Sequence, residues 1–153
     1  MLEYGNLFNN TRTFFPPVLS NVFIIPETRV LTLFSAPYTY LAGVPGFLIV
    51  PEQCQLVRVK GTAYTLGAAT TFTLGWTGTT SWTTNLGVAA VFTTVNVEMV
   101  TSIENNLTVP IIPNSNLLGV GQEIRMNGGN LTNGSGVIYI YLTYRLWPNG
   151  NPS

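Results

Sequence analysis

Residues 137–147 read Val-Ile-Tyr-Ile-Tyr-Leu-Thr-Tyr-Arg-Leu-Trp, the longest run of β-forming residues in the chain. Its side chains alternate with the period of two that is typical of a strand. The face predicted to be core carries Ile138, Ile140, Leu142, Tyr144 and Leu146. The opposite face is amphipathic and suits either solvent or a contact between subunits. We expect a subunit interface there, formed by Tyr139, Tyr141, Arg145 and Trp147.

Turn signals separate a series of short β-forming segments upstream of this run. Residues 127–136, Asn-Gly-Gly-Asn-Leu-Thr-Asn-Gly-Ser-Gly, favour the positive φ angles of tight turns, and they lack the Lys-Ser/Thr pair of a phosphate-binding loop. Helical patterns are nearly absent. We therefore predict an all-β fold, a single antiparallel β-sandwich of the jelly-roll type over residues 29–147. Its other strands are expected at 30–34, 38–40, 47–50, 55–66, 70–76, 88–92, 95–101, 107–112 and 122–126.

Residues 1–28 show no sustained period and are predicted to form an extended N-terminal arm. Pro16 and Pro17 remove backbone donors and favour extended conformations, and the aromatic pair Phe14 and Phe15 has no core of its own. We expect Phe14, Phe15, Pro16 and Pro17 to lie on a neighbouring subunit or along the sheet of their own chain. The alternative is that this segment contains the first strand of the same domain. Residues 148–153 are expected to be a loose C-terminal tail.

The composition points to a surface that other subunits cover. The chain is 46% hydrophobic but only 8% charged, and no charged residue occurs between positions 61 and 97. Ordinary soluble domains carry about 25% charged residues, and a net charge near zero favours association. The formal net charge is +0, which argues against nucleic acid and anionic membranes as partners. The longest apolar runs are too short for a membrane helix, and we expect no signal peptide.

The sequence offers little for catalysis. It contains no His and no Asp, which excludes Ser–His–Asp and Cys–His arrangements and His-based metal sites. The six glutamates stand in no motif, and Cys54 is the only cysteine, so we expect it to be a buried hydrophobe. No enzymatic activity and no cofactor are predicted. Trp82, flanked by Thr and Ser, is the best candidate for an exposed ligand-binding loop, but we favour packing or a subunit contact for it.

Several short motifs resemble the head decoration (cement) proteins of tailed bacteriophages. They are the strand-like 30–33, the Val-Pro-Gly turn at 44–46, the apolar 47–50 and Thr-Tyr-Arg at 143–145. The resemblance spans residues 29–147 and implies a jelly roll that binds the outer capsid surface as a homotrimer. It also implies the major capsid protein as partner, a place in the virion and synthesis in the host cytoplasm. With this partner, we expect the arm to make the capsid contact through Phe14, Phe15, Pro16 and Pro17. The arm and the uncharged Thr-rich middle do not belong to this pattern.

Two other functions remain open on the sequence. The chain is also compatible with a receptor- or glycan-binding module of a virion, in which Trp82 would contact the ligand. It is equally compatible with a jelly-roll coat subunit that builds the shell itself. A coat subunit should form closed particles when expressed alone, whereas a decoration protein should stop at small oligomers.

Overall fold

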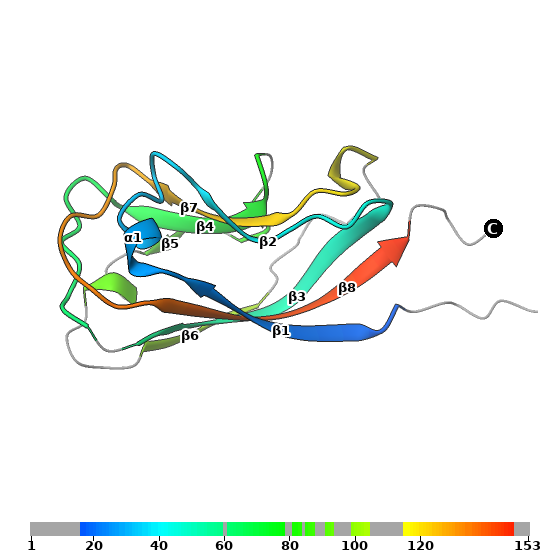
Figure 1. The fold of residues 1–153 in the computed structure, drawn as a ribbon, viewed down its shortest axis with the longest axis horizontal. Coiled ribbons are helices and arrows are strands. Elements are labelled where there is room, and N and C mark those ends of the chain that lie inside the picture. Colours follow the sequence, from blue (N-terminus) through cyan, green and yellow to red (C-terminus); the bar gives the residue numbers. More distant parts are fainter. Residues whose placement is uncertain are drawn as a thin grey trace, which may run out of the picture.

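The computed structural model describes residues 16–59, 61–78, 81–83, 85–87, 91–93, 99–104 and 115–148. Two four-stranded sheets face each other as two layers (Figure 1). The first, sheet A, has the order β1-β8-β3-β6, and the second, sheet B, has the order β2-β7-β4-β5. The strands of sheet A are β1 (Val18–Ile25), β8 (Ile138–Pro148), β3 (Phe47–Arg58) and β6 (Met99–Glu104). Those of sheet B are β2 (Tyr38–Leu41), β7 (Gln122–Asn127), β4 (Thr71–Trp76) and β5 (Leu86–Gly87).

The connections confirm the predicted sandwich. All neighbouring strands are antiparallel, and the chain crosses between the sheets at every step except from β4 to β5. This alternation of strands over two sheets is the topology of a jelly roll. The short α1 (Glu27–Val30) lies on the path from β1 to β2, and the 3-10 helix η2 (Ser115–Leu117) precedes β7.

Strand β8 organises sheet A because it pairs with β1 on one side and with β3 on the other. Ile138, Ile140, Leu142 and Tyr144 point inward and are buried, as the alternation predicts. Between the sheets they meet aromatic residues of sheet B and its loops, among which Phe72 and Phe92 pack edge to face with ring centroids 5.5 Å apart. Burial of each such large apolar side chain contributes about 1.5–3 kcal/mol.

The prediction of a strand at 30–34 is wrong. Pro26 opens the turn of α1, and the chain continues in turns as far as Ser35. Val30 and Leu33 are both fully buried, and their spacing of three residues places them on one side of a helical turn. The prediction of a strand at 88–92 is also wrong where it can be compared, because Val91 and Phe92 lie in a helical turn.

The segments 47–50 and 55–66 were predicted as two strands, but β3 is one strand that ends at Arg58. Its pairing with β8 shifts register between Pro51 and Gln53, which leaves Glu52 as an extra residue. Such a bulge bends the strand and lets one continuous segment follow a twisted partner. The strand expected at 95–101 is β6, displaced to Met99–Glu104, and the strand expected at 107–112 lies outside the described residues.

The body of the sandwich begins at Val18 and not near Arg29. Residues 18–25 form β1, which pairs with β8 along its whole length, so this part of the expected arm is the first strand of the domain. Phe14 and Phe15 lie outside the described residues, as do residues 149–153 of the expected tail, whereas Pro148 still belongs to β8.

Candidate subunit interface

Apolar side chains gather on the outer face of sheet A, where β1 and β8 meet. Val22 and Ile24 of β1 are 52% and 51% exposed, and Tyr141 of β8 is 43% exposed. Val22 stands opposite Tyr141 in the pairing of β1 with β8. Tyr139 of β8 has Ile24 of β1 on one side and the half-buried Val57 of β3 on the other. Side chains directly opposite each other in antiparallel strands have Cβ atoms about 4.5–5.5 Å apart, so these five residues form one cluster. We call Val22, Ile24, Val57, Tyr139 and Tyr141 the outer A patch.

The patch lies at an unprotected sheet edge. β1 is the outermost strand of sheet A, and its sequence VLSNVFII contains no charge and no proline. Its eight residues pair with β8 without a register shift, so no bulge turns the edge away. Natural proteins usually protect a long edge with one of these devices, and an unprotected apolar edge is a site of association.

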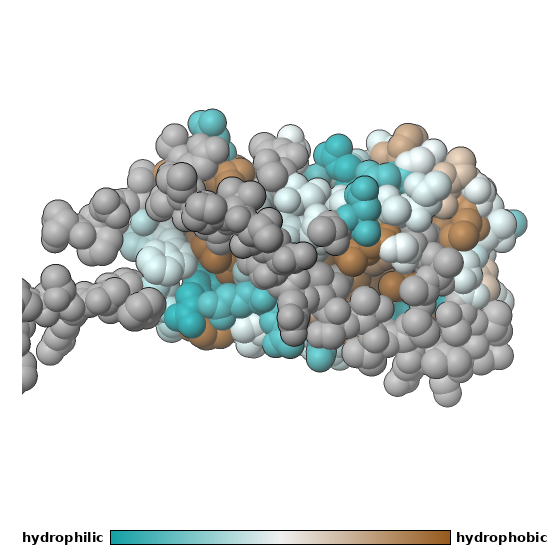
Figure 2. Space-filling view, turned by 180° about the vertical axis from the view of Figure 1, so that it is seen from behind, coloured by the Kyte–Doolittle hydropathy of each residue, from teal (hydrophilic) through white to brown (hydrophobic). Residues whose placement is uncertain are grey.

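Figure 2 shows the molecule from behind relative to Figure 1. In Figure 2, hydrophobic residues reach the surface at several places with hydrophilic residues between them. Scattered apolar residues of this kind are normal for a soluble protein and need no explanation. The contiguity of the outer A patch is therefore the feature that points to an interface.

Two of the four predicted interface residues lie away from the patch. Arg145 donates hydrogen bonds to the Glu52 carboxylate and, at 2.6 Å, to the Pro16 carbonyl oxygen, so it is engaged within its own chain. Trp147 is half-buried and packs against the core cluster. Of the residues expected to contact the capsid, Pro16 is buried beside Arg145 and Pro17 is exposed.

Trp82 is not an exposed ligand-binding residue. It is only 2% exposed, and its indole Nε1 donates a hydrogen bond of 2.8 Å to the Gln122 side chain. Its backbone N–H donates to the Leu74 carbonyl oxygen at 3.0 Å, which holds the loop against β4. Packing, which was part of the favoured interpretation of Trp82, is therefore confirmed, and the alternative of an exposed ligand-binding loop is wrong.

Val22 and Ile24 are interface candidates that the sequence analysis missed. They were assigned to the arm because the prolines and aromatic residues before them show no period. The sequence VLSNVFII has no apolar–polar alternation, because the exposed positions Val22 and Ile24 are apolar like the inward Phe23 and Ile25. Its only signal was the content of the β-forming residues Val, Phe and Ile.

The described residues hold no metal centre or reactive thiol. Within them, no group of three or more His, Cys, Asp or Glu side chains is placed to bind a metal ion. Cys54 is fully buried, as expected, and burial raises the pKa of its thiol to about 12, which keeps it protonated and unreactive. No helix in the described ranges has the length and apolar character to cross a membrane.

Comparison with known proteins finds similarity at the level of structure. No protein-family model matches the sequence, and no curated protein matches it. A chain of the solved cyanophage Pam1 capsid asymmetric unit superposes with a TM-score of 0.50 and 15% sequence identity. The superposition covers 91% of this chain and 91% of that chain. At this identity the likeness shows a shared fold over nearly the whole length of both chains.

Proposed function

We propose that this chain is a structural protein of a bacteriophage particle, a decoration (cement) protein that binds the outer capsid surface as a homotrimer and stabilises it. The observation that carries the proposal is the shared fold with a chain of a phage capsid asymmetric unit over 91% of both chains. The charge-poor composition supports it, because a chain with 8% charged residues suits a surface that other subunits cover.

The outer A patch is the proposed contact between copies in the trimer. A three-fold interface is heterologous, so the patch of one subunit meets a different surface of the next. The patch carries no charged residue, and burying it costs no charge desolvation. Obligate interfaces are apolar and bury about 2,000–5,000 Å² in total, so further residues around the patch take part.

The N-terminal segment is the proposed contact with the major capsid protein. Arg145 donates a hydrogen bond to the carbonyl oxygen of Pro16, the first residue that the structure describes, and so holds this residue next to sheet A. Phe14 and Phe15 precede that point directly and supply apolar anchors. In this proposal the protein acts by contact area alone and catalyses no reaction.

Light scattering coupled to size exclusion tests the trimer. We expect a mass three times the chain mass of 16.7 kDa, and a stable monomer at micromolar concentration contradicts the proposal. Ile24→Lys should give a folded monomer, because it places a charge in the patch. Phe34→Lys is the matched control, since Phe34 is 48% exposed on the turn after α1, and it should remain a trimer.

Cosedimentation with shells of the major capsid protein tests the attachment. The full chain should sediment with the shells, and a chain that lacks residues 1–15 should stay in solution as an intact trimer. Unchanged sedimentation of the truncated chain would exclude the proposed capsid contact of the arm. Closed particles formed by this chain alone would show a coat subunit in place of a decoration protein.

A further inference from the structure

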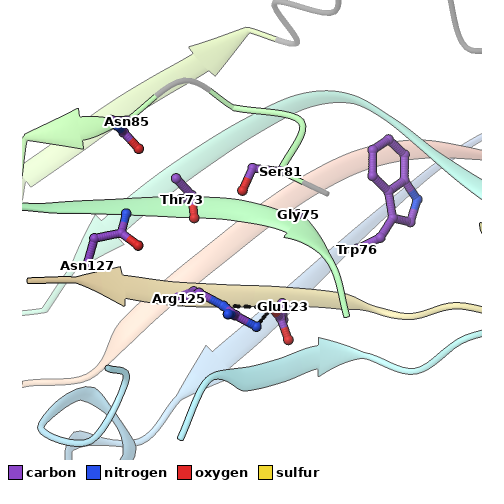
Figure 3. Close-up of a pocket in the computed structure, with 8 residues that line it drawn as sticks. All are labelled: Thr73, Gly75, Trp76, Ser81, Asn85, Glu123, Arg125 and Asn127. Carbon is purple, nitrogen blue, oxygen red and sulfur yellow. Dashed lines mark hydrogen bonds and ion pairs between the residues drawn. The ribbon is translucent and has the colours of Figure 1, made fainter. Parts of the chain in front are cut away.

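The outer face of sheet B carries a small polar pocket of about 220 Å³. Its floor is the pair of strands β4 and β7, where Thr73 stands opposite Arg125 and Gly75 stands opposite Glu123. Because Gly75 has no side chain, the sheet is hollowed at that position. Figure 3 shows the hydroxyl and amide groups of the lining around this strand pair. The pocket is lined by Thr73, Gly75, Trp76, Ser81, Asn85, Glu123, Arg125 and Asn127.

The loop after β4 builds the rim of the pocket. Ser81 forms a bridge with Gly75, and the backbone N–H groups of Trp82 and Thr83 donate to the Leu74 carbonyl oxygen at 3.0 and 3.3 Å. These bonds return the loop to the edge of β4. Asn85, which is exposed, stands farther along the same rim. The buried Trp82 therefore anchors this part of the rim to the core.

Glu123 is the most informative group in the pocket. The residue is only 7% exposed although it is a carboxylate, and its Oε1 accepts from Arg125 Nε at 3.1 Å and from Arg125 Nη2 at 2.8 Å. No described residue donates a hydrogen bond to its Oε2. This oxygen is not among the buried atoms that lack a partner, and Glu123 lines the pocket, so a ligand hydroxyl there can donate to it in place of water.

The remaining lining groups define the class of ligand. The one carboxylate and the one guanidinium cancel in charge, and hydroxyl and carboxamide groups supply donors and acceptors around them. The carboxylate of the lining is already paired with the Arg125 guanidinium, which disfavours a cation there, and the polar walls do not favour an apolar molecule. The volume is below the roughly 300–1,000 Å³ of pockets for drug-sized ligands, which limits the occupant to a small molecule or one unit of a larger one.

We infer that this pocket binds a neutral polyhydroxylated ligand, a single hexose unit of a saccharide. The site lies on the outer face of sheet B, whereas the outer A patch lies on the outer face of sheet A, and the two faces point away from each other (Figure 1). The inference therefore goes beyond the proposed structural function and does not depend on it.

Nuclear magnetic resonance of the full chain tests the inference with glucose, galactose, mannose and N-acetylglucosamine at millimolar concentrations. At least one of these sugars should shift the amide resonances of Ser81, Glu123 and Arg125. Asn85→Ala and Glu123→Gln should each weaken that binding by about tenfold or more. Gln55→Ala is the matched control, since Gln55 is an exposed carboxamide on sheet A, and it should leave the binding unchanged.

Two results of the sugar titrations would overturn the inference. No shift with any of the four sugars, or shifts that both pocket variants leave unchanged, would overturn the inference. N-acetylneuraminic acid serves as an anionic probe, and binding of this sugar alone would show an anion site at Arg125 and overturn the neutral class. Asn85→Ala keeps the experiment decisive if Glu123→Gln does not fold, because Asn85 is exposed. Failure of sugar binding with an intact trimer would leave the structural function unaffected.

Discussion

Trp82 Nε1 donates a hydrogen bond of 2.8 Å to Oε1 of Gln122, and both side chains are buried between the sheets. The bond ties the loop after β4 to the first residue of β7. It also explains how a polar Gln is accommodated in the core, since buried polar groups need partners. Among the residues that the structure describes, none bonds the buried Gln122 Nε2 atom, so the indole supplies the hydrogen bond that holds this side chain.

We predict that Trp82→Phe lowers the free energy of unfolding by about 1–3 kcal/mol, because it leaves the Gln122 side chain without its donor. The double variant Trp82→Phe/Gln122→Leu should recover most of this loss, since it removes both polar groups together. Urea denaturation of Trp82→Phe, of Gln122→Leu and of the double variant measures the coupling free energy between the two side chains. Strictly additive losses would show that the hydrogen bond has no role in stability.

Arg58 is a second buried polar group, and it joins three separate segments. Its guanidinium donates to the carbonyl oxygens of Thr62 at 2.6 Å, Ser135 at 3.2 Å and Phe92 at 3.3 Å, and it lies over the Tyr64 ring at 5.2 Å. The side chain is only 1% exposed. The planar fork with five donors is what allows one residue to reach all these groups.

We predict that Arg58→Met costs about 3 kcal/mol or more of stability, because several buried carbonyl groups lose their donor. Arg58→Lys should restore little, since an ammonium group cannot reproduce the geometry of the fork. Arg29→Met is the control, because Arg29 is exposed, and it should change stability by less than about 1 kcal/mol. Thermal unfolding followed by circular dichroism measures all three, and wild-type stability of Arg58→Lys would refute the argument.

The sequence predicted the parts of the fold that depend on a local period. The alternation over 138–147 identified β8 and its buried face. The turn residues before it take the expected positive φ angles at Gly128, Asn133 and Gly134. They do not close a hairpin, because this segment crosses from β7 of sheet B to β8 of sheet A. The turn of α1 was missed because Val30, Leu31 and Leu33 favour a strand locally, and burial of Val30 and Leu33 decides otherwise. Burial of side chains in the core outweighs the strand propensity of such a short segment.

The candidate sites depended on contacts that no local pattern contains. Trp82 has polar neighbours in sequence, yet Gln122, which is 40 positions away, receives its N–H. Arg145 was assigned to an interface because it shares a face with Tyr141, but the bulge at Glu52 brings a carboxylate to it. The polar pocket combines β4, β7 and the loop after β4, so only the sheet pairing reveals it.

Stability should fall at alkaline pH because two buried acids stay protonated in the fold. Burial raises the pKa of the Cys54 thiol from 9.0 to about 12. Burial and, second, the nearby Glu27 raise the pKa of Tyr64 from 10.0 to about 12, against an opposing contribution of Arg58. The unfolded chain loses these protons first. This stabilisation is therefore complete below pH 9 and decreases as the pH rises toward about 12.

Urea unfolding at a series of pH values measures this dependence. Cys54→Ala should flatten the part of the curve that begins near pH 9, because the unfolded chain then has no thiol to ionise. A wild-type curve that is level from neutral pH to the upper end of this window would contradict the predicted shifts.

Thiol labelling gives an independent test of the burial of Cys54. The thiolate is the reactive form, and in the folded protein the residue is inaccessible and protonated. We predict that a disulfide reagent at pH 8 labels Cys54 only as fast as the protein opens, and completely in denaturant. Rapid labelling under native conditions would place the thiol at the surface.

Arg145 is predicted to hold the beginning of β1 in place. It binds the Glu52 carboxylate at the bulge of β3 and the Pro16 carbonyl oxygen at 2.6 Å, so it connects three segments of sheet A. The ion pair is partly exposed, with side-chain exposures of 26% and 37%, so Arg145→Met should cost at most about 1 kcal/mol of global stability. The substitution should destabilise the beginning of β1 more strongly, because Pro16 loses its hydrogen bond to Arg145.

Amide hydrogen exchange separates the local effect from the global one. Arg145→Met should speed exchange at residues 18–20 while the amides in the middle of β8 remain protected, since local opening needs less free energy than global unfolding. Ser20→Ala is the control, because it removes only the 3.3 Å contact between Ser20 and Thr143 on the same strand pair, and it should leave these rates nearly unchanged.

If the hydrogen bond from Arg145 to Pro16 positions the N-terminal segment for the capsid, Arg145→Met should also weaken cosedimentation with shells while the trimer persists. Unchanged exchange at residues 18–20 would show that β1 is held by its pairing with β8 alone.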